Sequence, residues 1–531
     1  MTRNVAAPLV AAASGLALLG AHPPIGWWWL TFLHPPLLIG ALWLIDDHTA
    51  PARTSLRRAA QIGLIAGVVA FGPMLSWLIV APAGVLGWSL LVVFQGAWYA
   101  VLAIVLSWFL DRAWLPLIAA VLWTGVDAWR GIVPLNGFEW GGIAYAHVDA
   151  SWMLPIARLV GGRGITLLVV LIGVAAAVAI RITVRGARRD GIGAMEQTLG
   201  TARLSLGLLV GGLLVSIVTT VGPPPEDDDH LEILVVQGHD IRQWEETVPD
   251  RPLHVTTNMR DETIAAVEEG GRPDLTVWPE SSIDLDPTTD RGARLAPVAE
   301  EAMQVAGEVI AGVTRDAPDD PSERYITAGR FDGSLVEEER YAKRRLVPFG
   351  EYIPGRPFLE WIPPLEQVPR DARPGDGPSY LTTSTGVRVA AVICFETLFT
   401  DISRQNVMAG DEPAQLLLSV TNDASFGDTA EPAQHLAQVQ LRAVETGRWT
   451  VHAALSGSSA FVDPEGRVHD ATPLFETASI RRDVPLVSAV TPYLVIGDVV
   501  GWVTRLSVLV AVVFAAIGWR RLRRPASSER A

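Results

Sequence analysis

Three short segments in the second half of the chain carry side chains that could together transfer an acyl group. Glu280 follows the apolar run 275–278, Lys343 precedes an apolar turn, and Cys394, the only cysteine, follows the apolar run 387–393. A thiol attacks an acyl carbon as the thiolate, a carboxylate can accept its proton, and an ammonium can stabilise the oxyanion that forms. These residue types therefore indicate covalent acyl chemistry if the fold brings them together.

Each of these residues also has a simpler explanation when it is considered alone. Glu280 could be a solvated loop carboxylate, Lys343 could belong to a basic surface loop, and Cys394 could be an inert core residue. Glu396 favours the chemical interpretation of Cys394, because a polar turn begins immediately after the thiol.

The elements that must position these residues alternate between short strands and helices in residues 223–498. Strands are expected at 231–236, 275–278, 308–313, 387–394 and 416–420, and helices at 261–269, 295–305 and 431–447. This order is typical of an α/β sheet covered by helices. Catalytic groups in such sheets gather where strands end, and we expect Glu280 at the end of its strand.

Long apolar blocks on both sides of this domain predict membrane spans. Hydrophobic residues make up 49% of the 531 residues and charged residues only 19%, whereas about 25% is typical of soluble domains. A span needs about 20 predominantly apolar residues. Eight spans are expected, at approximately 5–21, 25–45, 59–80, 84–110, 114–132, 164–183, 203–221 and 499–519. The chain then divides into a membrane bundle (1–222), a catalytic domain (223–498) and a last span with a basic tail (499–531).

Arginine clusters follow every second predicted span and indicate how the bundle is oriented. Cytoplasmic loops carry the excess of positive charge, so both termini are expected in the cytoplasm and the domain 223–498 outside it. The arginines concerned lie at 53–58, 112, 181–189 and 520–524. The net charge is +5 for 1–222, +5 for 499–531 and about −25 for 223–498. An acidic aqueous domain argues against a nucleic-acid partner, which would need a basic patch.

Two loops carry large apolar side chains that could act at the membrane surface. Residues 136–140 lie in the external loop 133–163, and they could pack as a lid on the spans or contact a substrate. The loop 356–365 contains Phe358, Trp361 and Ile362 among prolines. It could cover the core of its own domain, or it could dip into the outer bilayer surface and gate the site.

The Glu, Lys and Cys in this order, each in its local motif, resemble the nitrilase superfamily. The resemblance is closer to a membrane-embedded branch of that superfamily, the bacterial apolipoprotein N-acyltransferase family, and it covers nearly the whole chain. The motifs that carry it are Trp278-Pro279-Glu280, Lys343 with Leu346-Val347-Pro348-Phe349-Gly350-Glu351, Cys394-Phe395-Glu396 and Thr421-Asn422-Asp423. The string 346–351 is specific to this family.

The resemblance implies a polytopic helical membrane bundle that carries an extracytoplasmic, nitrilase-like αββα sandwich. It implies Cys394 as the nucleophile, Glu280 as the general base and Lys343 as the oxyanion stabiliser. Glu351 would support the site near the lysine, and the backbone N–H of Phe395 would complete the oxyanion hole.

Three further residues match family positions whose roles are less specific. Trp244, Glu396 and Asn422 correspond to further supporting or substrate-binding residues. The sequence departs from the family where Phe395 replaces a Tyr, where Ser425 replaces a Trp, and where residues 455–459 replace an Asn-Asn-Gly-like motif. These departures concern the substrate pocket and leave the three catalytic positions unchanged.

The implied reaction is a ping-pong acyl transfer. Cys394 would take an acyl chain from a membrane phospholipid and pass it, as a thioester, to the α-amino group of an S-diacylglyceryl cysteine at a lipoprotein N-terminus. One hard step thereby becomes two easier ones. No metal or organic cofactor is expected, because no Cys/His cluster has zinc spacing and no Gly-rich phosphate loop occurs. We expect the enzyme to be monomeric.

Two other functions are compatible with parts of the sequence. A membrane-tethered amidase or nitrilase acting on a soluble amide would use the same three residues, with water in place of the amine. A transporter or receptor with an external binding domain would not need Cys394 at all. The predicted spans hold few charged residues, which argues mildly against transport.

Overall fold

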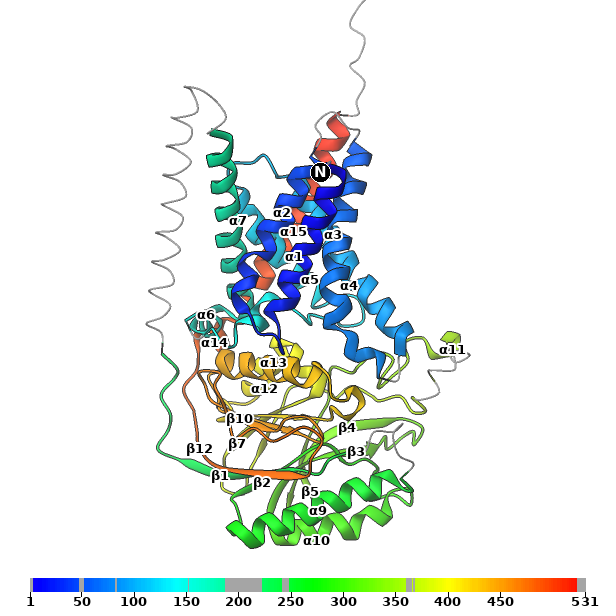
Figure 1. Cartoon of the computed structure of the whole chain (residues 1–531). Coiled ribbons are helices and arrows are strands. Elements are labelled where there is room, and N and C mark those ends of the chain that lie inside the picture. Colours follow the sequence, from blue (N-terminus) through cyan, green and yellow to red (C-terminus); the bar gives the residue numbers. More distant parts are fainter. Residues whose placement is uncertain are drawn as a thin grey trace, which may run out of the picture.

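A bundle of long helices stands on a sandwich of two β-sheets (Figure 1). This computed structural model describes residues 3–46, 52–81, 84–150, 152–186, 222–240, 248–359, 365 and 368–522. The long helices of the bundle are α1 (Arg3–Ala21), α2 (His34–Ile45), α3 (Ala52–Met74), α4 (Gly84–Ser107), α5 (Leu115–Arg130), α7 (Gly162–Gly186) and α15 (Val499–Leu522). Shorter helical pieces between them are η1 (Trp28–Phe32), η2 (Ser76–Ile79), η3 (Ile143–His147) and α6 (Leu154–Val160).

Three helical segments among the described residues are long and apolar enough to cross a membrane. They are Trp28–Ile45, Gly84–Ser107 and Gly162–Val184, and two shorter apolar helices cover Val5–Ala21 and Val499–Ala515. Every predicted span but the seventh overlaps one of the long helices, and the seventh, 203–221, lies outside the described residues. The protein is therefore a membrane protein, and the count of eight spans stays a prediction.

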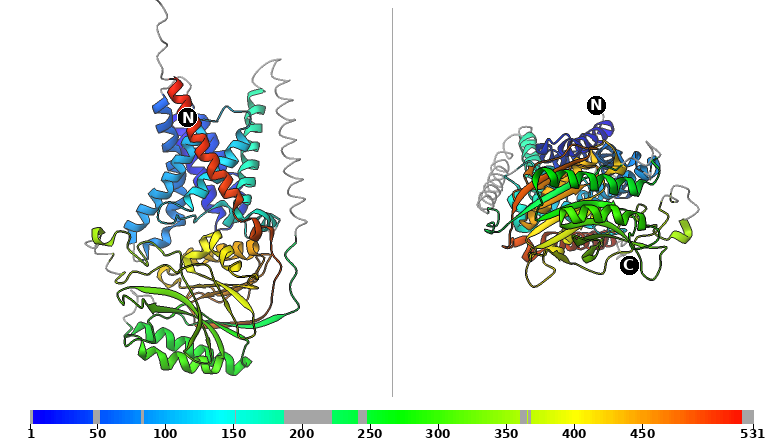
Figure 2. Two further views of the ribbon diagram at one scale, coloured as in Figure 1. Left: turned by 180° about the vertical axis from the view of Figure 1, so that it is seen from behind. Right: turned by 90° about the horizontal axis from the view of Figure 1, so that it is seen from below.

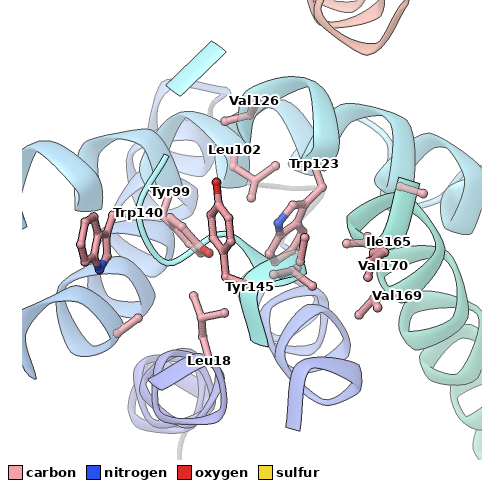
Figure 3. Close-up of a cluster of buried hydrophobic side chains, with 14 of the residues drawn as sticks. Leu18, Tyr99, Leu102, Trp123, Val126, Trp140, Tyr145, Ile165, Val169 and Val170 are labelled. Atoms are coloured by element: carbon pink, nitrogen blue, oxygen red, sulfur yellow. The ribbon is translucent and has the colours of Figure 1, made fainter. Parts of the chain in front are cut away.

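The bundle has an aromatic core that the apolar helices share. Figure 3 shows Tyr99 and Trp123 among aliphatic side chains such as Leu18 and Val169, which come from different helices. The ring of His34 lies edge-on to Trp123, with 5.0 Å between the ring centroids. The packing of such large rings fixes how the helices cross, and it gives the domain below a rigid support.

Each of the two sheets has six strands. The first has the order β12-β1-β2-β3-β4-β5 and the second the order β11-β10-β9-β8-β7-β6. The strands of the first sheet are β1 (His230–Gln237), β2 (Leu275–Ile283), β3 (Glu308–Asp316), β4 (Arg324–Asp332), β5 (Glu337–Ala342) and β12 (Ala478–Pro485). Those of the second are β6 (Tyr380–Thr382), β7 (Arg388–Ile393), β8 (Leu416–Thr421), β9 (Thr450–Ala454), β10 (Ala460–Val462) and β11 (Val468–His469).

The sheets pack face to face, and helices cover both outer faces. Helices α9 (Arg251–Gly270) and α10 (Ala296–Ala306) lie on the first sheet, on the side away from the bundle (Figures 1 and 2). Helices α12 (Thr400–Val407) and α13 (Glu431–Thr446) lie between the second sheet and the bundle (Figure 1). Apolar residues of both sheets form one buried cluster between them. This is the αββα order that the family resemblance implies.

The structure corrects one expectation that bears on the site. The strand predicted at 275–278 continues to Ile283, so Glu280 lies within β2 and not after its end. The pairing of β2 with the parallel strand β3 shifts between Trp278 and Ile283. The interruption falls on Pro279, which has no backbone N–H to donate to a ladder. Glu280 is thus presented by an irregularity inside a central strand.

Polar contacts attach the bundle to α13 and its neighbours. Trp140 Nε1 donates to Gln434 Oε1 at 2.6 Å, Tyr145 OH donates to Leu398 O at 3.1 Å, and the backbone N–H of Gly162 donates to Glu445 Oε1 at 2.7 Å. The partners on the bundle side lie in the connection between α5 and α7 and at the start of α7. This connection therefore attaches the helical bundle to the β-sandwich.

Candidate active site

Cys394 lies at the point where β7 ends and a 3-10 turn, η6 (Cys394–Leu398), begins. Its φ angle is +50°, a left-handed conformation that costs an L-residue roughly 1–2 kcal/mol. Non-glycine residues held in this region cluster at functional sites. The side chain is partly buried and is the one thiol of the chain. The sharp turn therefore presents the sulfur beside the end of a buried strand.

Glu280 reaches the thiol from the facing sheet. Its carboxylate accepts a hydrogen bond from the Cys394 thiol, and it is 6% exposed. Its backbone passes very close to β3 at Gly312, where a Cβ atom would fall 2.3 Å from Pro279 O and 2.5 Å from the Cα of Glu280. Only glycine at position 312 therefore allows the irregular part of β2 to hold Glu280 where it is.

Lys343 lies beside Glu280 and is the third residue of the candidate site. It follows β5 directly and is fully buried. Its Nζ donates to Glu280 Oε1 at 3.1 Å and to Glu351 Oε1 at 2.5 Å. The other oxygen of Glu351 accepts from the backbone N–H of Val347 at 2.9 Å. Glu351 therefore contacts both the ammonium group and the turn that follows it, as the role implied by the family resemblance requires.

The charges of these groups are set mainly by burial and by one another. Burial raises the pKa of the Cys394 thiol well above its usual value, and the Glu280 carboxylate adds to the rise while Lys343 opposes it. Burial and the charge of Glu351 raise the pKa of Glu280 against the effect of Lys343. Burial alone would lower the pKa of Lys343, but Glu280, Glu351 and Cys394 hold it well above its usual value. The resting site thus contains a protonated thiol and an ammonium group, and the thiol needs a base.

Glu396 contacts the backbone around the site and is not hydrogen-bonded to Lys343, as Glu280 and Glu351 are. Its carboxylate accepts from Tyr341 OH at 2.9 Å, and from the backbone N–H groups of Arg344 at 2.7 Å, Arg345 at 3.1 Å and Ile393 at 3.0 Å. Burial raises its pKa. The side chain ties the segment after the lysine to the turn that holds the thiol, so its role is to position both.

Asn422 joins the site through its backbone. Its N–H donates to Glu280 Oε2 at 3.1 Å, and its side-chain amide donates to Asp240 Oδ2 at 3.2 Å. Asp240, which accepts from Arg251 Nε at 2.7 Å, is a supporting residue that sequence reasoning missed, since no motif surrounds it. Trp244, also predicted to contribute to the site, lies outside the described residues.

Aromatic rings connect the nucleophile to the bundle. Phe395 lies next to Phe138 with 6.1 Å between ring centroids, and Phe138 stacks on Trp140 at 5.9 Å. Trp77, in η2 after α3, lies 5.0 Å from Trp140 and 4.9 Å from Phe426 between ring centroids. The loop residues 136–140 thus pack on the spans and also line the approach to Cys394, so both of their expected roles are compatible with the geometry.

The loop 356–365 is described only in part. Helix α11 (Arg356–Leu359) begins it, and Phe358 there is 81% exposed. Trp361 and Ile362 lie outside the described residues. The proposal that this loop dips into the bilayer is therefore supported by the exposure of Phe358 alone.

Two family models match separate parts of the chain. A model described as the apolipoprotein N-acyltransferase N-terminal domain matches residues 14–175, and one described as carbon-nitrogen hydrolase matches residues 243–490. The second match covers every strand of the two sheets except β1, and all the site residues named above from Glu280 to Asn422. The sandwich therefore has the carbon-nitrogen hydrolase fold of the nitrilase type.

Similar proteins extend over most of the chain. An apolipoprotein N-acyltransferase of Sinorhizobium medicae is 33% identical over 87% of this chain and 87% of its own length. One of Geobacter metallireducens is 28% identical over 97% and 95%, respectively. Among solved structures, an amidase from Nesterenkonia sp. AN1 is 23% identical, with a TM-score of 0.36, over 50% of this chain and 94% of that one.

Proposed function

This chain belongs to the apolipoprotein N-acyltransferase family, and we propose that it N-acylates lipoproteins through a thioester on Cys394. The donor is a membrane phospholipid, and the acceptor is the α-amino group of the S-diacylglyceryl cysteine at a lipoprotein N-terminus. The enzyme is an acyltransferase of lipoprotein biosynthesis. The observation that carries the proposal is the buried contact among Cys394, Glu280 and Lys343, three residues from separate parts of the chain.

In the first half-reaction the thiol gives its proton to Glu280 as the sulfur attacks the ester carbonyl of the phospholipid. The new S–C bond forms a tetrahedral intermediate, and its negative charge develops on the former carbonyl oxygen. The ester C–O bond then breaks, and Glu280 returns the proton to the departing alkoxide of the lysophospholipid. General acid–base transfer of this kind typically contributes about 100- to 10,000-fold.

In the second half-reaction the lipoprotein amine attacks the thioester. Glu280 accepts a proton from the attacking nitrogen, the C–S bond breaks, and Glu280 returns that proton to the departing thiolate of Cys394. A stable amide is formed, and the enzyme returns to its resting state. Because a thioester is activated towards amines, the difficult exchange of an ester for an amide is divided into two easier steps.

Lys343 is the main stabiliser of the oxyanion in both halves. Two carboxylates hold its ammonium group in place before substrate arrives, so little reorganisation is needed when the charge appears. The backbone N–H of Phe395, the residue after the nucleophile, would be the second donor. Glu351 and Glu396 act through the lysine segment and are positioning residues.

The membrane bundle explains how lipid substrates reach the site. The aromatic rings from Trp77 to Phe395 form an apolar connection between the bundle and the nucleophile, and two lipid substrates can approach laterally from the bilayer. The arginine distribution supports a catalytic domain outside the cytoplasm with both termini inside. The enzyme acts as a monomer in this proposal.

An assay with a peptide acceptor distinguishes the proposed acyl transfer from hydrolysis. Purified wild-type enzyme is mixed with phospholipid and a synthetic S-diacylglyceryl peptide, and the products are identified by mass spectrometry. We expect an N-acylated peptide together with one lysophospholipid for each peptide acylated. Release of free fatty acid with an unmodified peptide would support a hydrolase, and no turnover of the phospholipid would support a receptor or transporter.

A further inference from the structure

Two histidines and an aspartate meet inside the protein behind the nucleophile turn. Asp423 follows β8, His435 lies in α13, and His452 lies in β9. Each offers one ligand atom, and the three atoms all lie within 4.8 Å of one another. All three residues are at most 2% exposed. The proposed acyl transfer uses none of them, and the spacing along the sequence does not suggest that they meet.

Two carboxylate oxygens at this cluster lack a hydrogen-bond donor. Among the described residues, Asp423 Oδ2 and Glu431 Oε2 have no partner. Glu431 is 2% exposed, and its Oε1 lies 3.9 Å from His435 Nδ1. A buried carboxylate without compensating donors is strongly unfavourable. A cation between these side chains would remove that cost.

The histidines are held as metal ligands usually are. His435 Nε2 is hydrogen-bonded to Thr397 Oγ1 at 2.8 Å, which leaves Nδ1 to face Asp423. His452 Nδ1 is hydrogen-bonded to Ser419 Oγ at 3.1 Å, which leaves Nε2 for an ion. Outer contacts of this kind fix the ring orientation and the tautomer of a ligating histidine.

We propose that Asp423, His435 and His452 form a buried zinc site, and that Glu431, whose Oε1 lies 3.9 Å from His435 Nδ1, moves onto the ion as the fourth ligand. Imidazole and carboxylate donors suit zinc, which takes four ligands in a tetrahedral arrangement in structural sites. The bound ion would be structural and would not touch the substrate. It offsets the negative charge of the two buried carboxylates.

The site would also steady the nucleophile. Thr397, which contacts His435, donates from its Oγ1 to the backbone carbonyl oxygen of Cys394 at 2.9 Å. An ion that fixes His435 therefore fixes Thr397 and the turn that presents the thiol. Loss of the metal is expected to lower the melting temperature and to slow acylation of Cys394 through this connection.

Metal analysis of the full-length protein tests the proposal. The enzyme is purified in detergent with a tag that contains no histidine, stripped with a chelator, reloaded with zinc alone and dialysed. We expect about one zinc per chain, as a closed four-ligand site predicts, and a higher melting temperature than that of the stripped protein. His452→Gln should lose both effects. His469→Gln is the matched control, because His469 lies on β11 outside the cluster and is paired with Asp463.

Cobalt substitution keeps the test decisive if the His452 variant does not fold. Stripped wild-type protein is loaded with cobalt(II), and the intense visible d–d bands of tetrahedral cobalt are recorded. Appearance of these bands, and their displacement by zinc, support the site. The proposal would be overturned if folded wild-type protein retained less than about one-tenth of an equivalent of zinc and showed no tetrahedral cobalt bands. The three residues would then form a hydrogen-bonded cluster without a metal. Acyl transfer itself is measured separately on the stripped protein, so failure of this site leaves the proposed function intact.

Discussion

The thiol of Cys394 is surrounded by groups that keep it protonated until substrate arrives. Burial and the nearby Glu280 carboxylate both raise its pKa, while Lys343 favours the thiolate. At an electropositive helix terminus, the surroundings lower the pKa of a cysteine and favour the thiolate. Cys394 lies in the opposite kind of site, so a base is needed to remove its proton. Glu280 is in direct contact with the thiol, so the proposed base is already in place. The arrangement limits reactions of the thiol with species other than a bound ester.

Removing the base or the ammonium should slow acylation of Cys394 without unfolding the protein. Glu280→Gln keeps the shape of the side chain but cannot accept the thiol proton. Lys343→Ala removes a donor to the oxyanion, which typically costs about 100- to 1,000-fold. Both rates are compared with that of Glu300→Gln, which alters an exposed glutamate on α10. A rate near that of wild type in either variant would show that its assigned role is wrong.

The pH dependence of acylation should depend on Glu351. The base must be deprotonated, so the rate falls as the pH drops through the pKa of Glu280, which burial and the charge of Glu351 raise. Glu351→Gln removes that charge, lowers the pKa of Glu280 and should move the acidic limb of kcat/KM to lower pH. The pH profile of the variant is measured beside that of wild type. An acidic limb that stays in place or moves to higher pH would contradict this account of the site.

The sequence singled out candidate residues that the structure brings together, because each lies in a recognisable local motif. Glu280, Lys343 and Cys394 follow one another in a fixed order, with Glu351 in the string after the lysine. The residues that sequence reasoning missed act through contacts between distant segments. Tyr341, which donates to Glu396, was visible only as a neighbour of Lys343. The pair of His435 and Asp423 could not be anticipated, because their meeting depends on how α13 packs on the second sheet.

At the level of the elements, the irregular part of β2 is what places the base. The strand lies parallel to β3, and its register shifts between Trp278 and Ile283. Ser281 within this stretch has a φ of +62°. The irregularity directs Glu280 towards the second sheet, where Cys394 ends β7. Two strands in different sheets therefore supply the base and the nucleophile.

A methyl group at position 312 should disturb this arrangement. In Gly312→Ala the new Cβ would overlap Pro279 O and the Cα of Glu280, so β2 must shift and the base must move with it. We expect acylation to fall by about 100-fold, as a shift of about 1 Å in catalytic geometry does. Gly333→Ala is the control, because no atom lies within 4 Å of a Cβ there. Because Gly333 has a positive φ, alanine there can lower the stability of the protein. Initial rates are therefore compared at a temperature where both variants are folded. Equal rates in the two variants would show that the close approach at Gly312 does not position the base.

Sequence patterns predicted the buried apolar strands and missed the more exposed strands β4 and β12, although these are eight or nine residues long. The buried strands β1, β3, β7 and β8 appear at the predicted places because they are continuous apolar runs. Strands β6, β10 and β11 are only two or three residues long and pair with strands nearby in the sequence. Runs this short hold too few residues for a strand pattern to be recognised. Helix α9 begins at Arg251, well before the predicted residue 261, because its first turns pack on β2 and are not distinguished by composition.

In the whole molecule, the catalytic sandwich meets the bundle on the face that carries α12 and α13 (Figure 1). The helices α9 and α10 lie on the far side, and Figure 2 shows them side by side from below. The nucleophile turn packs with the apolar core that the bundle shares with this face. Apolar side chains are therefore in continuous contact from the bundle to the turn that holds Cys394.

The orientation of the bundle can be tested with reporter fusions. The arginine clusters predict that residue 229 lies outside the cytoplasm and residue 524 inside it. An alkaline phosphatase fused after Asp229 should be active, and one fused after Arg524 should be inactive, while green fluorescent protein should show the reverse. Both fusions reporting the same side would exclude the predicted number of spans between these points.

The central claim is that the acyl chain is carried on Cys394. Purified enzyme is incubated with phospholipid and no acceptor, and its intact mass is measured before and after treatment with neutral hydroxylamine. The account predicts a single added acyl group on wild-type protein that hydroxylamine removes, that maps to Cys394, and that leaves with the amine when a diacylglyceryl peptide is added. Cys394→Ala should carry none and should transfer none. An acyl group on another residue, or full N-acylation of the peptide by Cys394→Ala, would contradict the account.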